Sequence, residues 1–364
     1  MRSLNYSLLI IIFAFFSCKK DKNIINGCTD SSAANYNPYA ILDDGSCLQY
    51  ITTPYLINIP NGFPLMQIPS DNPMTVEGVE LGKKLFNDPI LSADNSISCA
   101  TCHIQSNSFS QQSQYSVGID GIAGFRNASA LINLGWNSSF NWDGSASSLE
   151  EQAFEPVTNP IEMHNEWGNV ETELNQNEQY KDLFKKAFNI DYIDSVHVVK
   201  AIAQFERSLV SYNSKYDKFI RQEIQLTPSE LNGLTIFNTE KGDCFHCHGT
   251  NLFTNDDFHN NGLDSEPFSD LGLAIVSGNS EDAGKFRTPT LRNVELTAPY
   301  MHDGRFSTLE EVIDHYNSGG HYSSTVDPLM KKLGVGLLLT NQEKADLIAF
   351  LKTLTDDDLS LIHI

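Results

Sequence analysis

The sequence is poor in basic residues, and this limits the partners it can have. It contains 24 lysines and arginines against 46 aspartates and glutamates, a formal net charge of −22. Nucleic acids and anionic lipids repel such a surface, so neither is expected as a partner. A basic redox protein would be attracted to it, although a solvated acidic surface explains the same charge without any partner.

The apolar run near the N-terminus, residues 8–16, is too short for a membrane span. Arg2 precedes this run and Ser17 follows it, so residues 1–17 are predicted to be a bacterial signal peptide. The junction before Cys18 resembles a lipobox, which predicts a lipid anchor at Cys18 and no other membrane contact. An ordinary cleaved signal with an incidental cysteine is the alternative. The protein is therefore expected in the periplasm or the outer cell envelope.

Cysteine is scarce, and its seven positions fall into two groups. Four cysteines lie in the two C-x-x-C-H motifs, Cys99–His103 and Cys244–His248. Among the other three, Cys28 and Cys47 are predicted to pair, because disulfides persist in exported proteins. Residues 18–50 then form a lipidated spacer with a Cys28–Cys47 module. Its carboxylates offer ligands for calcium, although a disulfide-closed spacer needs no ion.

The C-x-x-C-H motif is the attachment pattern of a c-type haem. Two cysteines one helical turn apart can form thioethers with the haem vinyl groups, and the adjacent histidine reaches the iron. A zinc ribbon is a weaker interpretation, because its second cysteine pair follows after roughly 15–20 residues. A redox dithiol needs no histidine there. The sequence therefore predicts two covalent haem c groups, bound by Cys99, Cys102 and His103 and by Cys244, Cys247 and His248.

Helical patterns surround both motifs. Apolar residues at helical spacing predict a helix from Thr75 to Asn87 and a core helix from Asp194 to Tyr212. Capping boxes at Thr227, Thr308 and Thr340 predict the starts of three further helices. His246, inside the second motif, is expected to point elsewhere than His248.

These patterns predict a mainly α fold with two cytochrome c-like haem domains in tandem. The first domain spans residues 51–222 and begins with an extended arm. The second spans residues 223–355. It is expected to repeat the general arrangement of the first, as an internal duplication. Residues 249–290 are expected to form a long loop over the second haem, and residues 356–364 a disordered tail.

Further motifs stand in an order that resembles one family. They are Leu81–Pro89, Ile97–His103, Arg126–Ala128, Trp142–Gly144, Pro160–Met163 and Leu291–Gly304. Over about residues 75–355 the chain resembles the bacterial di-haem cytochrome c peroxidases and their relative MauG, the maturation enzyme of methylamine dehydrogenase. The resemblance implies a peroxidase that reduces hydrogen peroxide with electrons from a small periplasmic protein, a cytochrome c or a cupredoxin.

Two other functions stay open at this point. One is a MauG-like oxidase that modifies a protein or an organic substrate. The other is a non-enzymatic electron-transfer cytochrome, which would need six ligands on both irons and no acid over an open site. A homodimer is also left open.

The resemblance implies roles for individual residues. Glu162 matches the acid beside the open iron of the first, peroxidatic haem, where peroxide cleavage requires a proton carrier. Trp142 matches a tryptophan between the two haems, although a buried core tryptophan would look the same. Asn127 and the backbone carbonyls of Thr297 and Pro299 match the ligands of an inter-haem calcium, which prefers oxygen donors.

Two positions depart from the pattern of many peroxidases in the family. Ile119 stands where a histidine caps the first iron, and because isoleucine cannot ligate iron, the first haem is expected to be open without prior activation. Tyr316 stands where a methionine ligates the second iron in many peroxidases, and MauG has a tyrosine at the matching position. A phenolate favours ferric iron, so the second haem is expected to have a lower potential. His315 is the competing ligand.

Overall fold

The computed structural model describes residues 24–31, 33, 35–48 and 50–361. The chain separates into two units, Met1–Tyr50 and Ile51–Ile364. The predicted signal peptide, the anchor at Cys18 and residues 362–364 lie outside the described residues.

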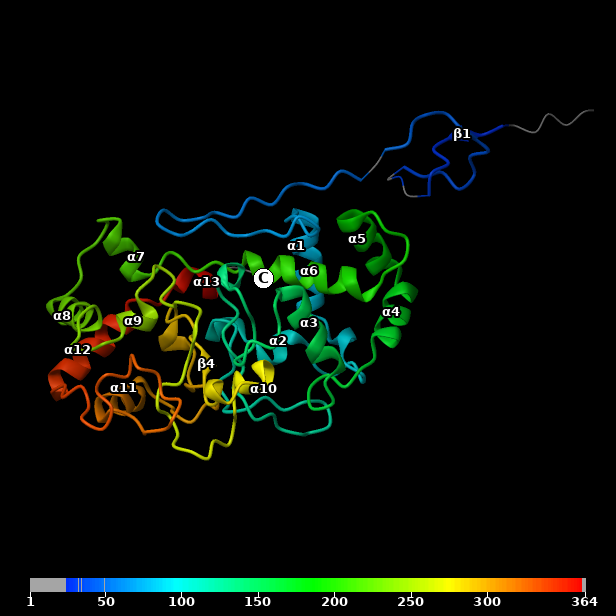
Figure 1. Ribbon diagram of the computed structural model, residues 1–364. Helices are drawn as coiled ribbons and strands as arrows, with labels where there is room; N and C mark the ends of the chain where they lie inside the picture. The colour runs from blue at the N-terminus through cyan, green and yellow to red at the C-terminus, as the bar shows by residue number, and fades with distance from the viewer. Residues whose placement is uncertain (1–23, 32, 34, 49, 362–364) are drawn as a thin grey trace, which may run out of the picture. The chain divides into compact units, whose positions relative to one another are not determined.

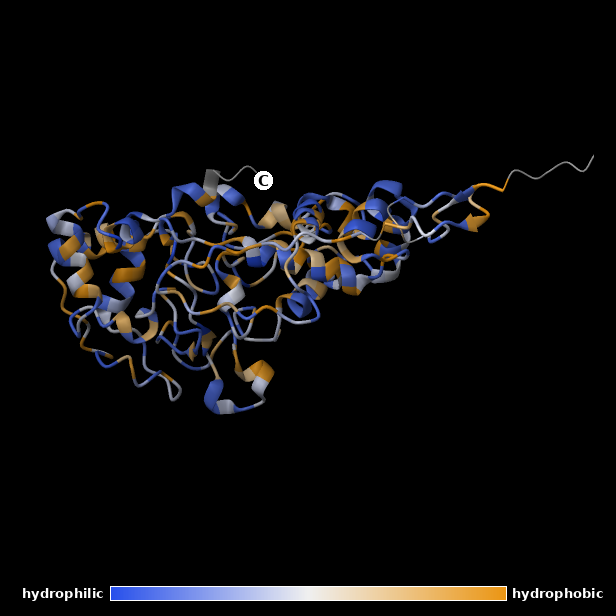
Figure 2. Ribbon diagram, turned by 90° about the horizontal axis from the view of Figure 1, so that it is seen from above, coloured by the Kyte–Doolittle hydropathy of each residue, from blue (hydrophilic) through white to orange (hydrophobic). Residues whose placement is uncertain are grey.

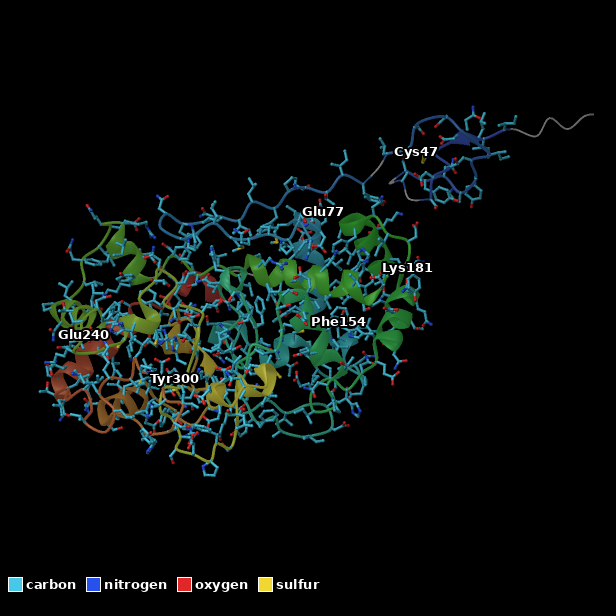
Figure 3. The ribbon with its side chains drawn as sticks, viewed as in Figure 1. Cys47, Glu77, Phe154, Lys181, Glu240 and Tyr300 are labelled. Atoms are coloured by element: carbon cyan, nitrogen blue, oxygen red, sulfur yellow. A yellow bond between two sulfur atoms is a disulfide. The ribbon has the colours of Figure 1, made fainter. Side chains whose placement is uncertain are left out.

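The first unit is built around one disulfide. Cys28 and Cys47 are bonded, with their Cα atoms 4.7 Å apart, and the predicted pair is confirmed (Figure 3). Two short strands, β1 (Asn26–Gly27) and β2 (Leu42–Asp43), pair in parallel beside it. The disulfide and this strand pair together hold the ends of the spacer module.

The second unit is mainly helical, which confirms the predicted class. Its α-helices are α1 (Val76–Asn87), α2 (Cys99–Cys102), α3 (Leu149–Thr158), α4 (Trp167–Gln176), α5 (Glu178–Phe188), α6 (Ser195–Ser208), α7 (Lys215–Ile220), α8 (Pro228–Phe237), α9 (Phe245–His248), α10 (Ala274–Ser277), α11 (Leu309–Ser318), α12 (Asn341–Lys352) and α13 (Asp357–Leu361). Figure 1 shows α8, α9, α11 and α12 at one end of this unit and α1 to α6 at the other.

Shorter elements connect these helices. The 3₁₀ helices are η1 (Pro89–Leu91), η2 (Gln105–Asn107), η3 (Leu134–Trp136), η4 (Ser280–Asp282) and η5 (Val294–Leu296). Strands β3 (Phe258–His259) and β4 (Phe286–Arg287) pair antiparallel. Both strands, α10 and η4 therefore interrupt the segment 249–290, which is otherwise irregular.

Polar caps start the helices where the sequence predicted them. The side chains of Thr75, Thr227, Thr308 and Thr340 each accept a hydrogen bond from a backbone N–H of the first turn. Helix α6 ends at Ser208, four residues before the predicted end. The backbone leaves the helix there because Ser211 N donates to Asn133 Oδ1 (2.8 Å) and Tyr212 N donates to Asp356 Oδ2 (2.7 Å).

In each half of the second unit, a glycine allows two helices to touch. Helix α1 packs on α6, and α8 packs on α12. A Cβ atom on Gly82 would lie 1.9 Å from the Ala201 carbonyl oxygen, and one on Gly233 would lie 2.0 Å from that of Asp346. The same backbone contact therefore occurs twice, as expected for an internal duplication.

Three phenylalanines pack at each of these helix pairs. Phe86 on α1 and Phe205 on α6 have ring centroids 5.1 Å apart, and Phe237 on α8 and Phe350 on α12 repeat that distance of 5.1 Å. The third ring is Phe109 in the first half, 6.2 Å from Phe86, and Phe253 in the second half, 5.9 Å from Phe237. Each half therefore has its own small aromatic core.

The prediction of a disordered tail is wrong for residues 356–361. Helix α13 forms there, and Leu359 is buried in the same cluster as Phe86 and Phe109. Asp356 is also buried, and its carboxylate accepts hydrogen bonds from the backbone of Tyr212 and Asn213 at 2.7 and 2.8 Å. These tertiary contacts order a segment whose local sequence is mostly acidic.

The arm at residues 51–72 contains no helix or strand, and one carboxylate holds its start. Thr53 donates to Glu77 of α1 through its backbone N–H (2.8 Å) and its hydroxyl (2.9 Å) (Figure 3). The helices carry both polar and apolar residues (Figure 2). None in the described part of the chain is long and apolar enough to span a bilayer.

The contact at Gly82 predicts a large loss of stability on substitution. Gly82→Ala would force the added methyl group against the Ala201 carbonyl, and overpacking of this kind costs about 1–3 kcal/mol. Gly168→Ala in α4 is the matched control, because nothing lies within 4 Å of its Cβ position. There alanine is expected to be neutral or stabilising by up to about 1 kcal/mol. Chemical denaturation measures both, and equal stabilities would contradict the close contact.

Candidate functional site

His103 follows the short helix α2, which carries Cys99 and Cys102. Its Nδ1 lies 2.9 Å from the Phe109 carbonyl oxygen. A carbonyl can only accept, so Nδ1 carries the hydrogen and the Nε2 lone pair is available to a metal. Burial lowers the pKa of His103, which keeps the ring neutral. The first motif thus presents two thiols and one imidazole ready to ligate.

The second motif repeats this geometry. His248 Nδ1 lies 2.8 Å from the Phe253 carbonyl oxygen, and burial lowers the pKa of His248 to about 4. Phe109 and Phe253 both have a positive φ, 56° and 54°, which is uncommon outside glycine. In each half the same unusual turn aims a carbonyl at the histidine.

A cavity lies beside the second motif, lined by Cys244, Cys247 and His248. Burial raises the pKa of the Cys244 thiol to about 12 and that of Cys247 to about 11. The remaining wall is largely apolar and includes Leu252, Leu291, Val294, Leu309, Ile313, Leu347 and Leu351. An apolar cavity with two thiols and an unprotonated imidazole nitrogen fits a large flat cofactor held through sulfur and nitrogen.

The structure brings Glu162 to the first motif. Burial raises the pKa of the Glu162 carboxyl, and a hydrogen bond from Asn159 Nδ2 (2.7 Å) opposes this. The negative charge of Glu162 in turn helps to raise the pKa of the Cys99 and Cys102 thiols. A carboxyl with this environment can hold and release a proton near the motif.

The loop that carries Ile119 is fastened directly to Glu162. Ile119 N donates to the Glu162 carbonyl oxygen at 3.0 Å. A Cβ on Gly118 would lie 2.3 Å from the Ile161 carbonyl, so only glycine permits this approach. The nearby His164 is exposed, and its Nδ1 lies 2.5 Å from Asp120 Oδ2. The backbone of the loop is thus held against the backbone of Glu162, and the residue at this point of the loop is aliphatic.

Residues 127–129 run between the two motifs. Trp142 Nε1 donates to the Asn127 carbonyl (2.8 Å), and both residues line the cavity of the second motif. Ser129 lines the same cavity, and its backbone opposes the lowering of the pKa of His103 by burial. Trp142 and this segment therefore connect the first histidine with the second cavity.

Asn127, Thr297 and Pro299 also line this cavity. Asn127 Nδ2 donates to the carbonyls of Ser113 (3.1 Å) and Gln114 (3.2 Å), which fixes the orientation of its amide. The three residues expected to hold calcium therefore line the same cavity.

Tyr316 lines the cavity of the second motif, whereas His315 lies outside its lining. The Tyr316 hydroxyl accepts a hydrogen bond from Asn261 Nδ2 at 3.1 Å, and burial raises the pKa of Tyr316 to about 12. His315 Nε2 lies 3.2 Å from the Asn261 carbonyl. The geometry thus points the tyrosine, rather than the histidine, at the cavity.

Two residues to which the sequence assigned no role, His259 and Met301, also line this cavity. Met301 Sδ lies 3.6 Å from Asn261 Nδ2. His259 has both ring nitrogens engaged, with Asn255 Nδ2 at 2.9 Å and Asp327 Oδ2 at 2.6 Å, so neither nitrogen is available to a metal. Both residues lie in irregular segments or very short strands, where periodicity carries no signal.

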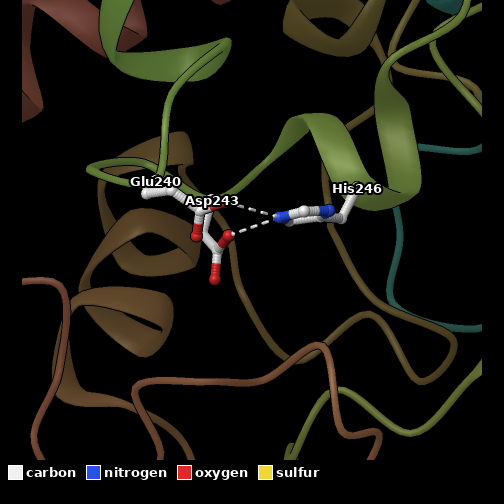
Figure 4. Close-up of side chains that lie close together, drawn as sticks. All are labelled: Glu240, Asp243 and His246. Carbon is white, nitrogen blue, oxygen red and sulfur yellow. Dashed lines mark hydrogen bonds and ion pairs between the residues drawn. The ribbon is translucent and has the colours of Figure 1, made fainter.

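His246 points away from His248, as expected. Its Nε2 lies 3.1 Å from Asp243 and 3.3 Å from Glu240 (Figure 4). These three residues could hold a metal ion, but Lys331 Nζ lies 2.8 Å from His246 Nε2 and 2.9 Å from Glu240 Oε2. The ammonium group already supplies the positive charge, so this cluster is a surface ion-pair network.

Comparison with known proteins places this site in a family. A family model described as di-haem cytochrome c peroxidase matches residues 76–225. MauG of Methylorubrum extorquens is 39% identical over 290 residues, which cover 79% of this chain and 80% of the relative. The chain belongs to the di-haem cytochrome c peroxidase family. Membership implies an enzyme with haem c cofactors, and it confirms the resemblance found in the sequence.

Other members of the di-haem peroxidase family extend the comparison. Cytochrome c551 peroxidase of Nitrosomonas europaea is 34% identical, with 81% of this chain and 84% of the relative covered. A crystal structure of a MauG-like protein associated with microbial copper homeostasis has a TM-score of 0.79 and 36% identity. The match covers 84% of this chain and 97% of that one.

If each C-x-x-C-H motif of this di-haem peroxidase holds one haem, the two can be removed separately. The double variant Cys99→Ala, Cys102→Ala is expected to carry one covalent haem per chain instead of two. Pyridine haemochrome absorbance, divided by protein concentration, measures this ratio. The control is Cys28→Ala, Cys47→Ala, which removes the disulfide and should leave two haems. An unchanged ratio in the first variant would contradict the assignment.

Proposed function

We propose that this protein is a di-haem c-type peroxidase that reduces hydrogen peroxide with electrons from a small cytochrome c or cupredoxin. The observation that supports this best is the half-buried carboxyl of Glu162, whose charge acts on both cysteines of the first C-x-x-C-H motif. The loop bonded to the backbone of Glu162 carries Ile119, which cannot ligate a metal. When bound, the two haems would supply the reduction of peroxide and the storage of oxidising equivalents. An exported protein, lipid-anchored through Cys18 in the periplasm or outer envelope, fits this reaction.

The cofactor would be held by the residues of the two motifs. Cys99 and Cys102, and likewise Cys244 and Cys247, provide thioethers, while His103 and His248 offer Nε2 to the irons. The hydrogen bonds from Nδ1 to Phe109 and Phe253 orient both rings and increase their donor strength. We assign residues 51–222 to the peroxidatic domain and residues 223–355 to the electron-transfer domain.

Glu162 would carry the proton that peroxide cleavage requires. Its carboxylate takes a proton from one peroxide oxygen and delivers it to the other, which leaves as water. Burial raises the pKa of Glu162, while Asn159 keeps the ionised form accessible. Ile119 excludes a protein ligand from this side and leaves space for peroxide without prior activation.

Trp142 would serve as the path for electrons between the two domains. Its indole donates to the Asn127 carbonyl and lines the second cavity, while the backbone of residue 129, in the same segment, acts on the pKa of His103. A calcium ion bound by Asn127 and the carbonyls of Thr297 and Pro299 would stabilise this connection. The oxygen donors of these three residues are of the kind that calcium prefers as ligands.

Tyr316 would be the second ligand of the second iron. Burial disfavours a phenolate unless a cation lies next to it, and ferric iron in the cavity supplies that charge. Tyr316 also favours the second candidate function, a MauG-like oxidase acting on a protein or an organic substrate. The two functions differ in whether the oxidised state is rapidly re-reduced by the donor or persists until it meets another substrate.

The role of Glu162 predicts a large and specific kinetic defect. Glu162→Gln keeps the shape of the side chain but cannot accept a proton, so peroxide reduction is expected to slow by about 10²–10⁴-fold. Stopped-flow mixing of the holoprotein with peroxide measures the rate. Glu166→Gln is the matched control, an exposed acid four residues away that should leave the rate unchanged. An unchanged rate in the first variant would remove the assigned role.

The ligand assignment predicts a spectral change at the second haem. Tyr316→Phe removes the phenolate and is expected to alter the ferric absorption and electron paramagnetic resonance signals and to raise the potential of that haem. His315→Gln is the control, because His315 lies outside the cavity and should leave both signals in place. Should only the second variant change the spectrum, histidine is the ligand.

A further inference from the structure

One buried acid near the first motif has no role in the chemistry above. Glu206, on α6, is 4% exposed. Its Oε2 atom is buried and has no hydrogen-bond partner among the residues that the structure describes. A carboxyl left in this state carries a large desolvation cost, which its surroundings must explain.

The internal duplication shows where this side chain points. The close contacts of Gly82 with Ala201 and of Gly233 with Asp346 set α6 and α12 in the same register. In that register Phe205 matches Phe350, and both rings belong to the aromatic cores described above. The next residues along the two helices are Glu206 and Leu351.

Leu351 lines the cavity beside the second C-x-x-C-H motif. Its counterpart Glu206 is therefore placed against the first motif, where a carboxyl replaces a leucine. The electrostatics agree, because burial is the largest cause of the raised pKa of Cys99 and the charge of Glu206 is the next. Two independent observations thus bring Glu206 to the first haem site.

The charged groups that face Glu206 do not neutralise the negative charge of its carboxylate. Arg207 follows it on α6, but its guanidinium is bound to Glu150 of α3 through two hydrogen bonds of 2.8 and 2.7 Å. The charge of Glu150 raises the pKa of Glu206 further, and Cys99 on α2 is another titratable neighbour. Helix α1 buries only glycine and apolar side chains on the face packed here. Burial, set against the charge of Arg207, raises the pKa of Glu206 to about 8.

We propose that Glu206 is a positioning residue of the first haem pocket whose carboxylate lowers the reduction potential of the first haem. The inference rests on the proposed function, since it requires a haem at Cys99 and Cys102. A buried negative charge stabilises the more positive oxidised iron, and little solvent is present to screen it. When the adjacent cofactor gains one electron, the carboxylate takes up one proton from solvent, so the net charge of the pocket is unchanged.

The second haem pocket lacks this group, because leucine occupies the matching position. The two haems of one chain therefore differ in their response to pH. The first is easier to keep oxidised in alkaline solution, as suits the site that meets peroxide, while the second has no such dependence from this source.

Spectroelectrochemical titration of the holoprotein from about pH 6 to pH 10 tests this difference. In the wild type, the potential of the first haem is expected to fall as pH rises through about 8, the pKa of Glu206. Glu206→Gln is isosteric and uncharged, so its first-haem potential should lie above that of the wild type at high pH and match it at about pH 6. The Cys99→Ala, Cys102→Ala protein, with the second haem only, identifies which potential belongs to which haem.

Two further variants separate charge from packing. Glu206→Leu introduces the residue found at the matching position of the second pocket. It should shift the potential of the first haem in the same direction as Glu206→Gln. Glu80→Gln removes an exposed acid from the neighbouring helix α1 and should shift neither potential. A shift with leucine but not with glutamine would show a packing effect and overturn the proposal.

The pH dependence of the first-haem potential in the wild type tests the role of Glu206 even if a variant does not fold. A first-haem potential that is flat between about pH 6 and pH 10 would overturn the role of Glu206 while leaving the peroxidase assignment intact. A purified protein without covalent haem would instead overturn the proposed function itself.

Discussion

The contact of one glycine with one carbonyl, made twice, is the constraint on which the second unit depends. Gly82 and Gly233 let two helices approach until backbone meets backbone, closer than any side chain would permit. That approach sets the register of α1 on α6 and of α8 on α12, and it brings three phenylalanines together at each crossing. The third phenylalanine in each half then turns its carbonyl to the histidine of the motif. The orientation of both metal-binding rings thus follows from helix packing.

The duplication supplies two similar sites, and single substitutions make them different. Trp142 and His302 occupy matching places, each directly before an Asp-Gly pair and within matching bridges, Phe140 to Ala146 and Tyr300 to Phe306. Glu206 and Leu351 form another such pair. The carboxyls of Glu206 and Glu162 act on Cys99 of the first motif, whereas Tyr316 lines the cavity of the second. The two motifs therefore have different surroundings.

Ion pairs between distant segments hold the two halves together. Arg126, from the first half, binds Asp143 of the same half at 2.5 Å and Asp270 of the second half at 2.7 Å. Helix α13 returns from the C-terminus to bury Leu359 in the core of the first half. The pair between Arg126 and Asp270 is largely shielded from solvent, so removal of one partner would leave an uncompensated charge, and the pair resists separation of the halves. Trp142 and residues 127–129 lie in the region that these contacts stabilise.

The sequence by itself determined the chemistry of the two motifs, the starts of the helices and the family. C-x-x-C-H spacing, threonine caps and apolar periodicity are local patterns, and each has a local physical cause. The tertiary structure alone decided which distant residues meet. It showed the carbonyls of Phe109 and Phe253 at the histidines, Tyr316 rather than His315 at the cavity, an ordered helix at residues 357–361, and a buried Glu206. The burial of helix α13 depends on packing between segments more than a hundred residues apart, which no local pattern encodes. The two carbonyls lie only six and five residues from their histidines, but they depend on turns in which phenylalanine adopts an unusual positive φ.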